Sequence, residues 1–252
     1  MAHKLAFHIG NCFAHSFAVS HLGLAHIGLH IELALHAIHD DFKVQLAHTT
    51  DNGLAGFRIG VHTERRVLGR QALQGDAHLV LIALRLGFDA HFDNRIPETG
   101  VGASSGTGFW QIAQEGQIHS LHIGIQRNSN TLKLFDTAHH YGMKYILADE
   151  LFFENLPSVY EKIDALADSV DVLYCTICMD VFNAAIAPGV SAVAYNGIFA
   201  DATFMHFYRR ILKNSKLVAL DVAEVNPSLD IVDRTSKLAA SLVNEWFMAD
   251  AH

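Results

Sequence analysis

The residues that decide the fold are 79–93, LVLIALRLGFDAHFD, where an apolar run leads into two aspartates that flank a histidine. A short, almost uninterrupted apolar run such as Leu79–Phe88 is typical of a strand buried on both faces of a parallel sheet. Similar expected strands are Ser120–Gln126, Lys144–Leu147, Val172–Met179 and Leu217–Val222. The expected helices between and after them are Thr131–Tyr141, Ser158–Ser169, Asp201–Lys213 and Arg234–Phe247, with Ser158 and Asp201 as N-caps.

Strands that alternate with helices predict βαβ units, and therefore an α/β protein with a mostly parallel sheet. Ligands of such sheets bind beyond the carboxyl ends of the strands. The polar residues that directly follow the predicted strands are therefore the candidates for chemistry.

Composition agrees with a folded domain, because half of the 252 residues are hydrophobic and 17% are charged. The net charge of −8 leaves no basic footprint for nucleic acid. Three cysteines are too few for a disulfide scaffold in a chain of this size, so we expect a reducing, cytoplasmic compartment.

The composition changes sharply at residue 87. Residues 1–87 hold 11 of the 18 histidines, whereas all prolines, tryptophans and tyrosines follow. Leu5–Ile31 has no Lys, Arg, Asp or Glu, but its five histidines argue against a membrane span or a signal peptide. His26 and His30 have the i, i+4 spacing of a metal-binding arm, and histidines without any ligand are the plainer interpretation. We favour a third interpretation, in which residues 1–87 are out of frame and without a native strand set, and residues 88–252 form the catalytic domain.

Three strand ends carry candidate ligands. In an extended chain Asp89, His91 and Asp93 point to the same side, and two carboxylates with one imidazole suit Mn, Fe or Zn. Surface polar residues are the alternative interpretation of this motif. Cys178 and Asp180 end a second strand, where Cys178 and Cys175 have the spacing of a redox pair.

The redox interpretation is rejected because residues three apart in a strand point to opposite faces, so Cys175 is expected in the core. Glu224 follows the last predicted strand. Acidic groups crowded at one sheet edge repel one another unless a cation neutralises them, so the three strand ends together indicate a metal centre.

These motifs resemble the ureohydrolases, the arginase/agmatinase superfamily. The resemblance covers about residues 87–247 and rests on DAHFD at 89–93, TICMD at 176–180 with APGVSA at 187–192, and DVAEVNP at 221–227. SSGTGF at 104–109 and GIQRNSNT at 124–131 are similar to the formimidoylglutamase branch in particular. The resemblance implies an arginase-like three-layer α/β sandwich with two Mn²⁺. In this chain the N-terminal strands of that fold are expected to be missing or disordered.

The resemblance also implies residue roles. Asp89 bridges the two metals, His91 and Asp180 complete one site, and Asp93 binds the other metal and the bridging water. Cys178 stands where most relatives have a bridging aspartate, and a thiolate is a softer ligand. The substrate residues are Ser105, which replaces a usual histidine, Glu224 for the cationic amidine, and Arg127 for a carboxylate. A structural Arg127 is an equal alternative.

The family has an earlier Gly-Gly-x-His motif, and the one similar stretch in this chain is Gly75–His78. His78 lies too close to Asp89 for the crossover that separates them in the family, so the first metal site is expected to be incomplete and this chain poorly active. The expected reaction is hydrolysis of N-formimidoyl-L-glutamate to L-glutamate and formamide in histidine degradation. The alternatives are a ureohydrolase for a guanidino compound, a non-catalytic frame-shifted product, or a His-rich metal-binding protein. The expected partner is a small-molecule substrate, without nucleic acid or membrane, and a homo-oligomer is left open.

Overall fold

The structure, a computed structural model, describes residues 42–51, 54–63, 83–99, 104–115 and 119–250. Their strands are β1 (Phe42–Asp51), β2 (Leu54–Thr63), β3 (Ala83–Phe88), β4 (His119–Ile125), β5 (Lys144–Leu147), β6 (Val172–Cys178) and β7 (Leu217–Val225). All seven belong to one sheet with the order β1-β2-β7-β6-β3-β4-β5. The five strands from β7 to β5 run parallel, whereas β1 and β2 pair antiparallel with each other and β2 pairs antiparallel with β7.

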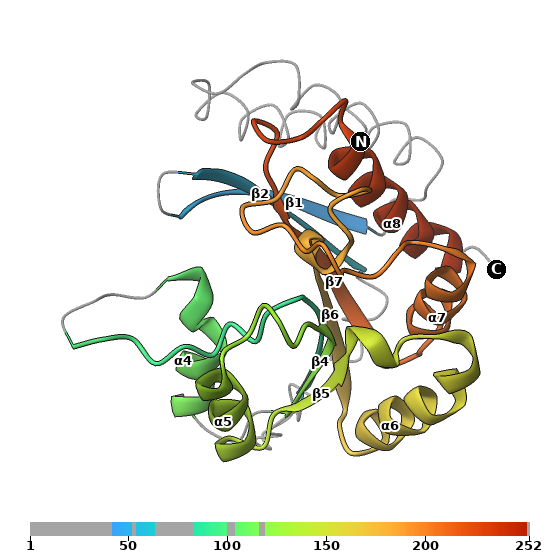
Figure 1. Ribbon diagram of the computed structural model, residues 1–252. Coiled ribbons are helices and arrows are strands. Elements are labelled where there is room, and N and C mark those ends of the chain that lie inside the picture. Colours follow the sequence, from blue (N-terminus) through green and yellow to red (C-terminus); the bar gives the residue numbers. More distant parts are fainter. Residues whose placement is uncertain (1–41, 52–53, 64–82, 100–103, 116–118, 251–252) are drawn as a thin grey trace, which may run out of the picture.

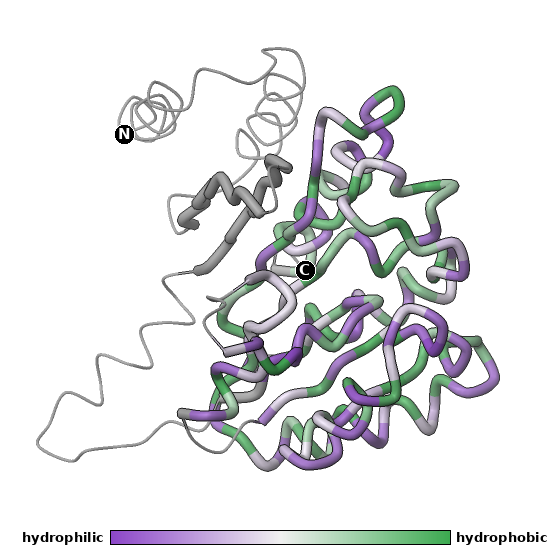
Figure 2. The backbone as a smooth tube through the Cα atoms, turned by 60° about the vertical axis from the view of Figure 1, so that its left-hand side comes forward, coloured by the Kyte–Doolittle hydropathy of each residue, from purple (hydrophilic) through white to green (hydrophobic). Residues whose placement is uncertain are grey.

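Helices cover both faces of this sheet, so the predicted three-layer α/β sandwich is confirmed. They are α4 (Gly108–Glu115), α5 (Leu132–His140), α6 (Leu156–Asp168), α7 (Ala202–Leu212) and α8 (Arg234–Asp250). Figure 1 shows α4 and α5 on one side of the parallel strands and α6, α7 and α8 on the other. Figure 2 shows hydrophilic and hydrophobic residues interspersed along the described part of the backbone, as expected where helices have one face against a sheet.

Two apolar cores follow from this layering. The larger core lies between the sheet and α6, α7 and α8, where Phe88 contacts Phe204, Phe207 and Tyr208 edge-on at centroid distances of 5.8 to 6.3 Å. The smaller core, on the α4 and α5 side, includes Phe92. Cys175 is fully buried in the larger core, which confirms its predicted structural place.

The predicted strands and most predicted helices agree with the structure to within a few residues. Asp201 is confirmed as the N-cap of α7, because its carboxylate accepts from the Phe204 amide over 3.0 Å. The Ser158 N-cap is wrong: α6 begins at Leu156 after Asn155, since Pro157 is well suited to the first turn of a helix. The helix α4 was not predicted.

The expectation that residues 1–87 offer no strand set is also wrong, because β1 and β2 form a hairpin whose second strand pairs with β7. The sequence does contain the signal. Phe57, Ile59 and Val61 alternate with other residues, and Asn52-Gly53 is a dipeptide typical of tight hairpins. The frequent histidines hid this pattern. The edge of β7 is consequently covered by a neighbouring strand.

Several sequence features lie outside the described residues. They are the Leu5–Ile31 segment, His26, His30 and His78, so the metal-arm and frame-shift interpretations are not tested here. Within the described part of the chain, no helix has both the length and the apolar character needed to cross a membrane.

Candidate metal centre

The candidate site lies at the carboxyl ends of β3 and β6, which are neighbouring parallel strands. Asp89 and His91 follow β3, and Asp180 lies in a short 3₁₀ turn after β6. One ligand atom from each of these three residues lies within 4.8 Å of the other two. His91 Nδ1 donates to Asp180 Oδ2 over 3.0 Å and lies 3.6 Å from Asp89 Oδ1. The structure therefore brings these three predicted ligands together.

The loop after β3 bends instead of remaining extended, and Asp93 stays near enough to interact electrostatically with Asp89, His91 and Asp180. The His91 amide donates to Asp89 Oδ1 over 2.7 Å, which curls the chain around the first carboxylate. Asp93 has a left-handed backbone with φ of 48°, and its carbonyl accepts from the Phe109 amide over 2.9 Å. Because of this turn, Asp93 lies beside the group of three and not within it.

Asn130 holds this loop in shape, and the sequence analysis missed it. Its Oδ1 accepts from the Phe92 amide over 3.1 Å, and its Nδ2 donates to the carbonyls of Ala90 at 2.8 Å and Gln126 at 2.7 Å. Ala90 and Phe92 flank His91 on its two sides. A buried asparagine with all of these bonds fixes backbone positions. The sequence signal was its place inside the GIQRNSNT stretch, which no local pattern ties to residues 89–93.

The electrostatics of the site are those of crowded acids around one imidazole. Burial, followed by repulsion from Asp180, raises the pKa of Asp89 well above its usual range. Burial likewise raises the pKa of Asp93 to about 7, with Asp180 as the next cause. Burial alone would lower the pKa of His91, but its hydrogen bonds to Asp180 and Asp89 raise that pKa to about 11.

These residues fit a divalent cation. Asp89 and Asp180 are 8% and 4% exposed, and buried like charges at this distance need a positive partner. The His91 imidazolium supplies that positive charge in the arrangement described. Two carboxylate oxygens and an imidazole nitrogen are ligands that suit Mn, Fe or Zn. A bound cation can replace the imidazolium proton in balancing the acids.

Cys178 and Glu224 lie near the metal-ligand group of Asp89, His91 and Asp180. Burial, followed by the negative charges of Asp180, Asp89 and Asp93, raises the pKa of the Cys178 thiol well above its usual range. Cys178 lies near the cluster but is not one of the three grouped residues. Glu224 follows Ala223, which pairs with Cys178 across β6 and β7, and its charge is close enough to raise the pKa of Asp93.

The two other predicted substrate residues lie on loops. Ser105 begins a 3₁₀ turn that precedes α4, next to Gly106, whose carbonyl accepts from the Arg95 amide over 2.9 Å. This contact and the Phe109–Asp93 bond attach the SSGTGF stretch to the loop of the metal cluster. Arg127 is exposed after β4 and donates from Nε to Asp149 Oδ2 over 3.3 Å.

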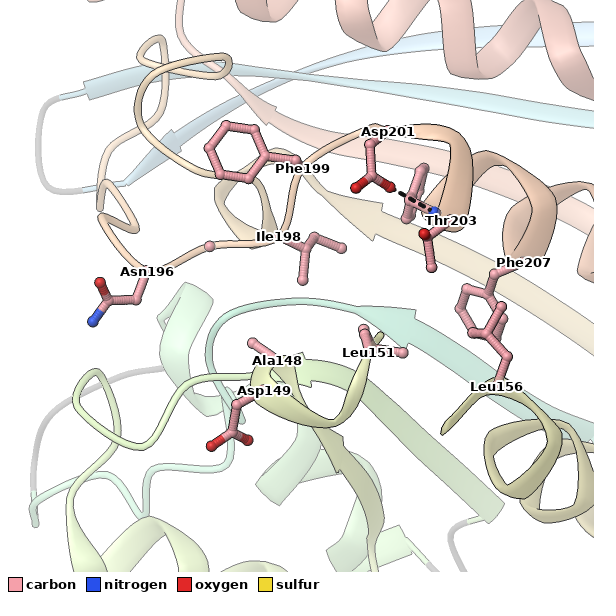
Figure 3. Close-up of a pocket in the computed structure, with 12 residues that line it drawn as sticks. Ala148, Asp149, Leu151, Leu156, Asn196, Ile198, Phe199, Asp201, Thr203 and Phe207 are labelled. Atoms are coloured by element: carbon pink, nitrogen blue, oxygen red, sulfur yellow. Dashed lines mark hydrogen bonds between the residues drawn. The ribbon is translucent and has the colours of Figure 1, made fainter. Parts of the chain in front are cut away.

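A cavity of about 260 Å³ opens between the 3₁₀ turn after β5 and the start of α7 (Figure 3). Its walls include Leu151, Leu156, Ile198 and Phe207, with Asp149 at the rim. None of the three clustered ligands lines it, so this cavity is separate from the candidate metal centre.

A three-layer α/β sandwich with clustered acids and a histidine at the carboxyl edge of its parallel strands defines a candidate metallohydrolase domain. The model of the arginase family matches residues 77–249. The chain belongs to the arginase family.

Two relatives that are similar to this chain are named formimidoylglutamases. The chain is 41% identical to the formimidoylglutamase of Staphylococcus carnosus (strain TM300) over 162 residues, which is 64% of this chain and 51% of the relative. A solved formimidoylglutamase from Bacillus subtilis is 26% identical, with a TM-score of 0.63 over 67% of this chain and 53% of that one.

A Trypanosoma cruzi formiminoglutamase variant solved with Mn²⁺ is 18% identical and shares the fold, with a TM-score of 0.59 over 74% of this chain and 60% of that one. The chain spans about half the length of the curated relatives it matches.

Proposed function

We propose that this chain hydrolyses the amidine bond of N-formimidoyl-L-glutamate and releases L-glutamate and formamide. One water is consumed: its oxygen ends in formamide, and the nitrogen attached to the glutamate carbon leaves as the amine. The observation that carries the proposal is the convergence of Asp89, His91 and Asp180 from two neighbouring strands, with Glu224 beside them. The named formimidoylglutamase relatives support the choice of substrate.

Asp89, His91 and Asp180 would hold a divalent metal, and Asp93 and Cys178 are the proposed ligands around a second one. We propose two Mn²⁺, and the one near Asp93 and Cys178 lacks a histidine ligand among the described residues. When bound, such ions lower the pKa of a water enough to provide hydroxide near neutral pH.

The remaining steps belong to the side chains of the chain itself. Glu224 supplies the negative charge that binds and orients the cationic amidine. Asp93 accepts a hydrogen bond from the attacking water and carries its proton to the leaving nitrogen, a task for a carboxylate within reach of both groups. This division of work needs Asp93 and Glu224 on opposite sides of the reacting carbon.

Substrate selection is proposed for Ser105 and Arg127. Ser105 provides a small hydroxyl at the position where, by the family resemblance, arginases and agmatinases usually carry a histidine. The planar Arg127 guanidinium suits the glutamate carboxylate, and it would exchange its exposed contact with Asp149 for the substrate. An Arg127 that only braces Asp149 is the competing interpretation.

The test is product analysis with the full chain and Mn²⁺. Formamide release from N-formimidoyl-L-glutamate should exceed urea release from agmatine or arginine, and Asp180→Asn should abolish it. Asp164→Asn is the matched control, because Asp164 is an exposed acid in α6 paired with Arg210. Urea release from agmatine at a comparable rate would contradict the proposed substrate and favour a guanidino compound.

We place the protein in the cytoplasm, where it would act in histidine degradation, and we leave a homo-oligomer as the assembly to test by light scattering. The catalytic segment is proposed to be residues 88–252, although β1, β2 and β3, which precede or reach residue 88, belong to the same sheet. The family match begins earlier, at residue 77.

A further inference from the structure

Glu224 has an unusual local geometry. Its backbone is left-handed, with φ of 65°, inside the strand β7. A residue other than glycine in this conformation is costly and is retained where the surrounding structure imposes it. The carboxylate Oε2 accepts from the Ser191 hydroxyl over 2.5 Å and from the Ser191 amide over 3.4 Å. Among the described residues, no donor is bonded to the other oxygen, Oε1.

The loop that carries Ser191 is itself fastened next to Glu224. The Asn226 amide donates to the Gly189 carbonyl over 2.7 Å, and the Gly189 amide donates to Thr235 Oγ1 over 2.7 Å. A Cβ at Gly189 would lie 2.6 Å from the Asp230 side chain, so only glycine permits this approach. Gly189 is therefore fixed to Asn226, directly after β7, and to Thr235 in α8, and Ser191 lies two residues further along this loop.

We propose that Ser191 is a positioning residue for Glu224. Its short hydrogen bond to a charged oxygen fixes the carboxylate in one orientation and leaves Oε1 as the acceptor for the amidine N–H of the substrate. The role rests on the proposed function, because it concerns the residue that binds the amidine. The APGVSA stretch at 187–192 thus has a role in orienting the Glu224 carboxylate, through its Ser191.

The first test is the kinetics of Ser191→Ala and Ser191→Thr. Ser191→Ala should raise the KM for N-formimidoyl-L-glutamate about tenfold, the lower end of the range for a hydrogen bond to a charged group, because the bond is exposed. Ser191→Thr, which keeps a hydroxyl, should restore most of the loss. Ser228→Ala is the matched control, since the Ser228 hydroxyl donates to the neutral Asn226 side chain nearby.

Inhibition by L-glutamate separates positioning from a general structural role. L-glutamate lacks the amidine, so its inhibition constant should be unchanged in Ser191→Ala. An equal loss of affinity for L-glutamate and for the substrate would overturn the proposal. In a Glu224→Gln background, Ser191→Ala should have no further effect on KM, and an undiminished tenfold effect there would also overturn it.

Crystal structures of the full chain and of Ser191→Ala test the same claim without turnover. The Glu224 carboxylate should leave its position in Ser191→Ala while the Gly189–Asn226 and Gly189–Thr235 bonds persist. A carboxylate that stays in place would refute the positioning role. If the unmodified chain releases no formamide, the proposed function fails, and these two structures still decide the role of Ser191.

Discussion

Replacing Asn130 with alanine should weaken both the fold and the metal centre. The change removes one acceptor and two donor bonds, at 3.1, 2.8 and 2.7 Å, from the backbone around His91. The Ala90 carbonyl keeps a second donor, the Gln126 amide at 3.1 Å. The Gln126 carbonyl likewise keeps the Ser129 amide at 3.4 Å. The Phe92 amide loses its side-chain partner, which predicts a loss of about 1 to 3 kcal/mol in unfolding free energy.

Metal affinity should fall as well, because the loop that aims Asp89 and His91 loses its support. Outer partners of ligating residues are typically worth about 10- to 100-fold in affinity. The assays are urea unfolding and a calorimetric Mn²⁺ titration of the full chain. Asn155→Ala is the matched control, since Asn155 makes a 2.7 Å bond to the Glu150 carbonyl away from the centre and should alter stability alone. A loss below about 0.5 kcal/mol, or Mn²⁺ affinity equal to that of the unmodified chain, would refute the reasoning.

Two other predictions concern stability. His122 is fully buried, neither ring nitrogen has a hydrogen-bond partner among the described residues, and burial, helped by Arg85, lowers its pKa to about 3. As the pH falls below about 6.5, the unfolded chain therefore protonates this histidine first, and the folded state loses stability. In His122→Leu the unfolding free energy should fall by about 2 to 3 kcal/mol less between pH 6.5 and pH 4.5 than in the unmodified chain. Equal losses in both proteins would contradict this. Asp201→Ala should cost about 1 kcal/mol by urea unfolding through the lost N-cap of α7, and an unchanged midpoint would show that the cap contributes nothing.

The sequence analysis located the parallel strands because each is an apolar run bounded by polar residues, as Lys144–Leu147 illustrates. Since parallel strands end at one edge, the meeting of Asp89 with Asp180 could also be predicted. The helix α4 was missed because it begins at Gly108, directly after a turn.

The shape of the loop after β3 could not be predicted from local sequence. The left-handed turn at Asp93 is accompanied by a bond from the Phe109 amide, and the residues around His91 are held by Asn130, 39 positions along the chain. Both contacts are non-local, and an extended-strand rule contains no information on them. For the same reason the hydroxyl of Ser191 could not be connected with Glu224 before the fold was known.

The central claim is that Asp89, His91 and Asp180 form a metal centre that hydrolyses an amidine. The most direct measurement is formamide release from N-formimidoyl-L-glutamate by the Mn²⁺-loaded full chain, alongside Asp180→Asn and after chelation. We predict a low but measurable rate, because the proposed metal near Asp93 and Cys178 has no histidine ligand among the described residues. That rate should be lost in Asp180→Asn and on chelation. Formamide release that persists unchanged in Asp180→Asn, or no release above the metal-free chain, would contradict the account.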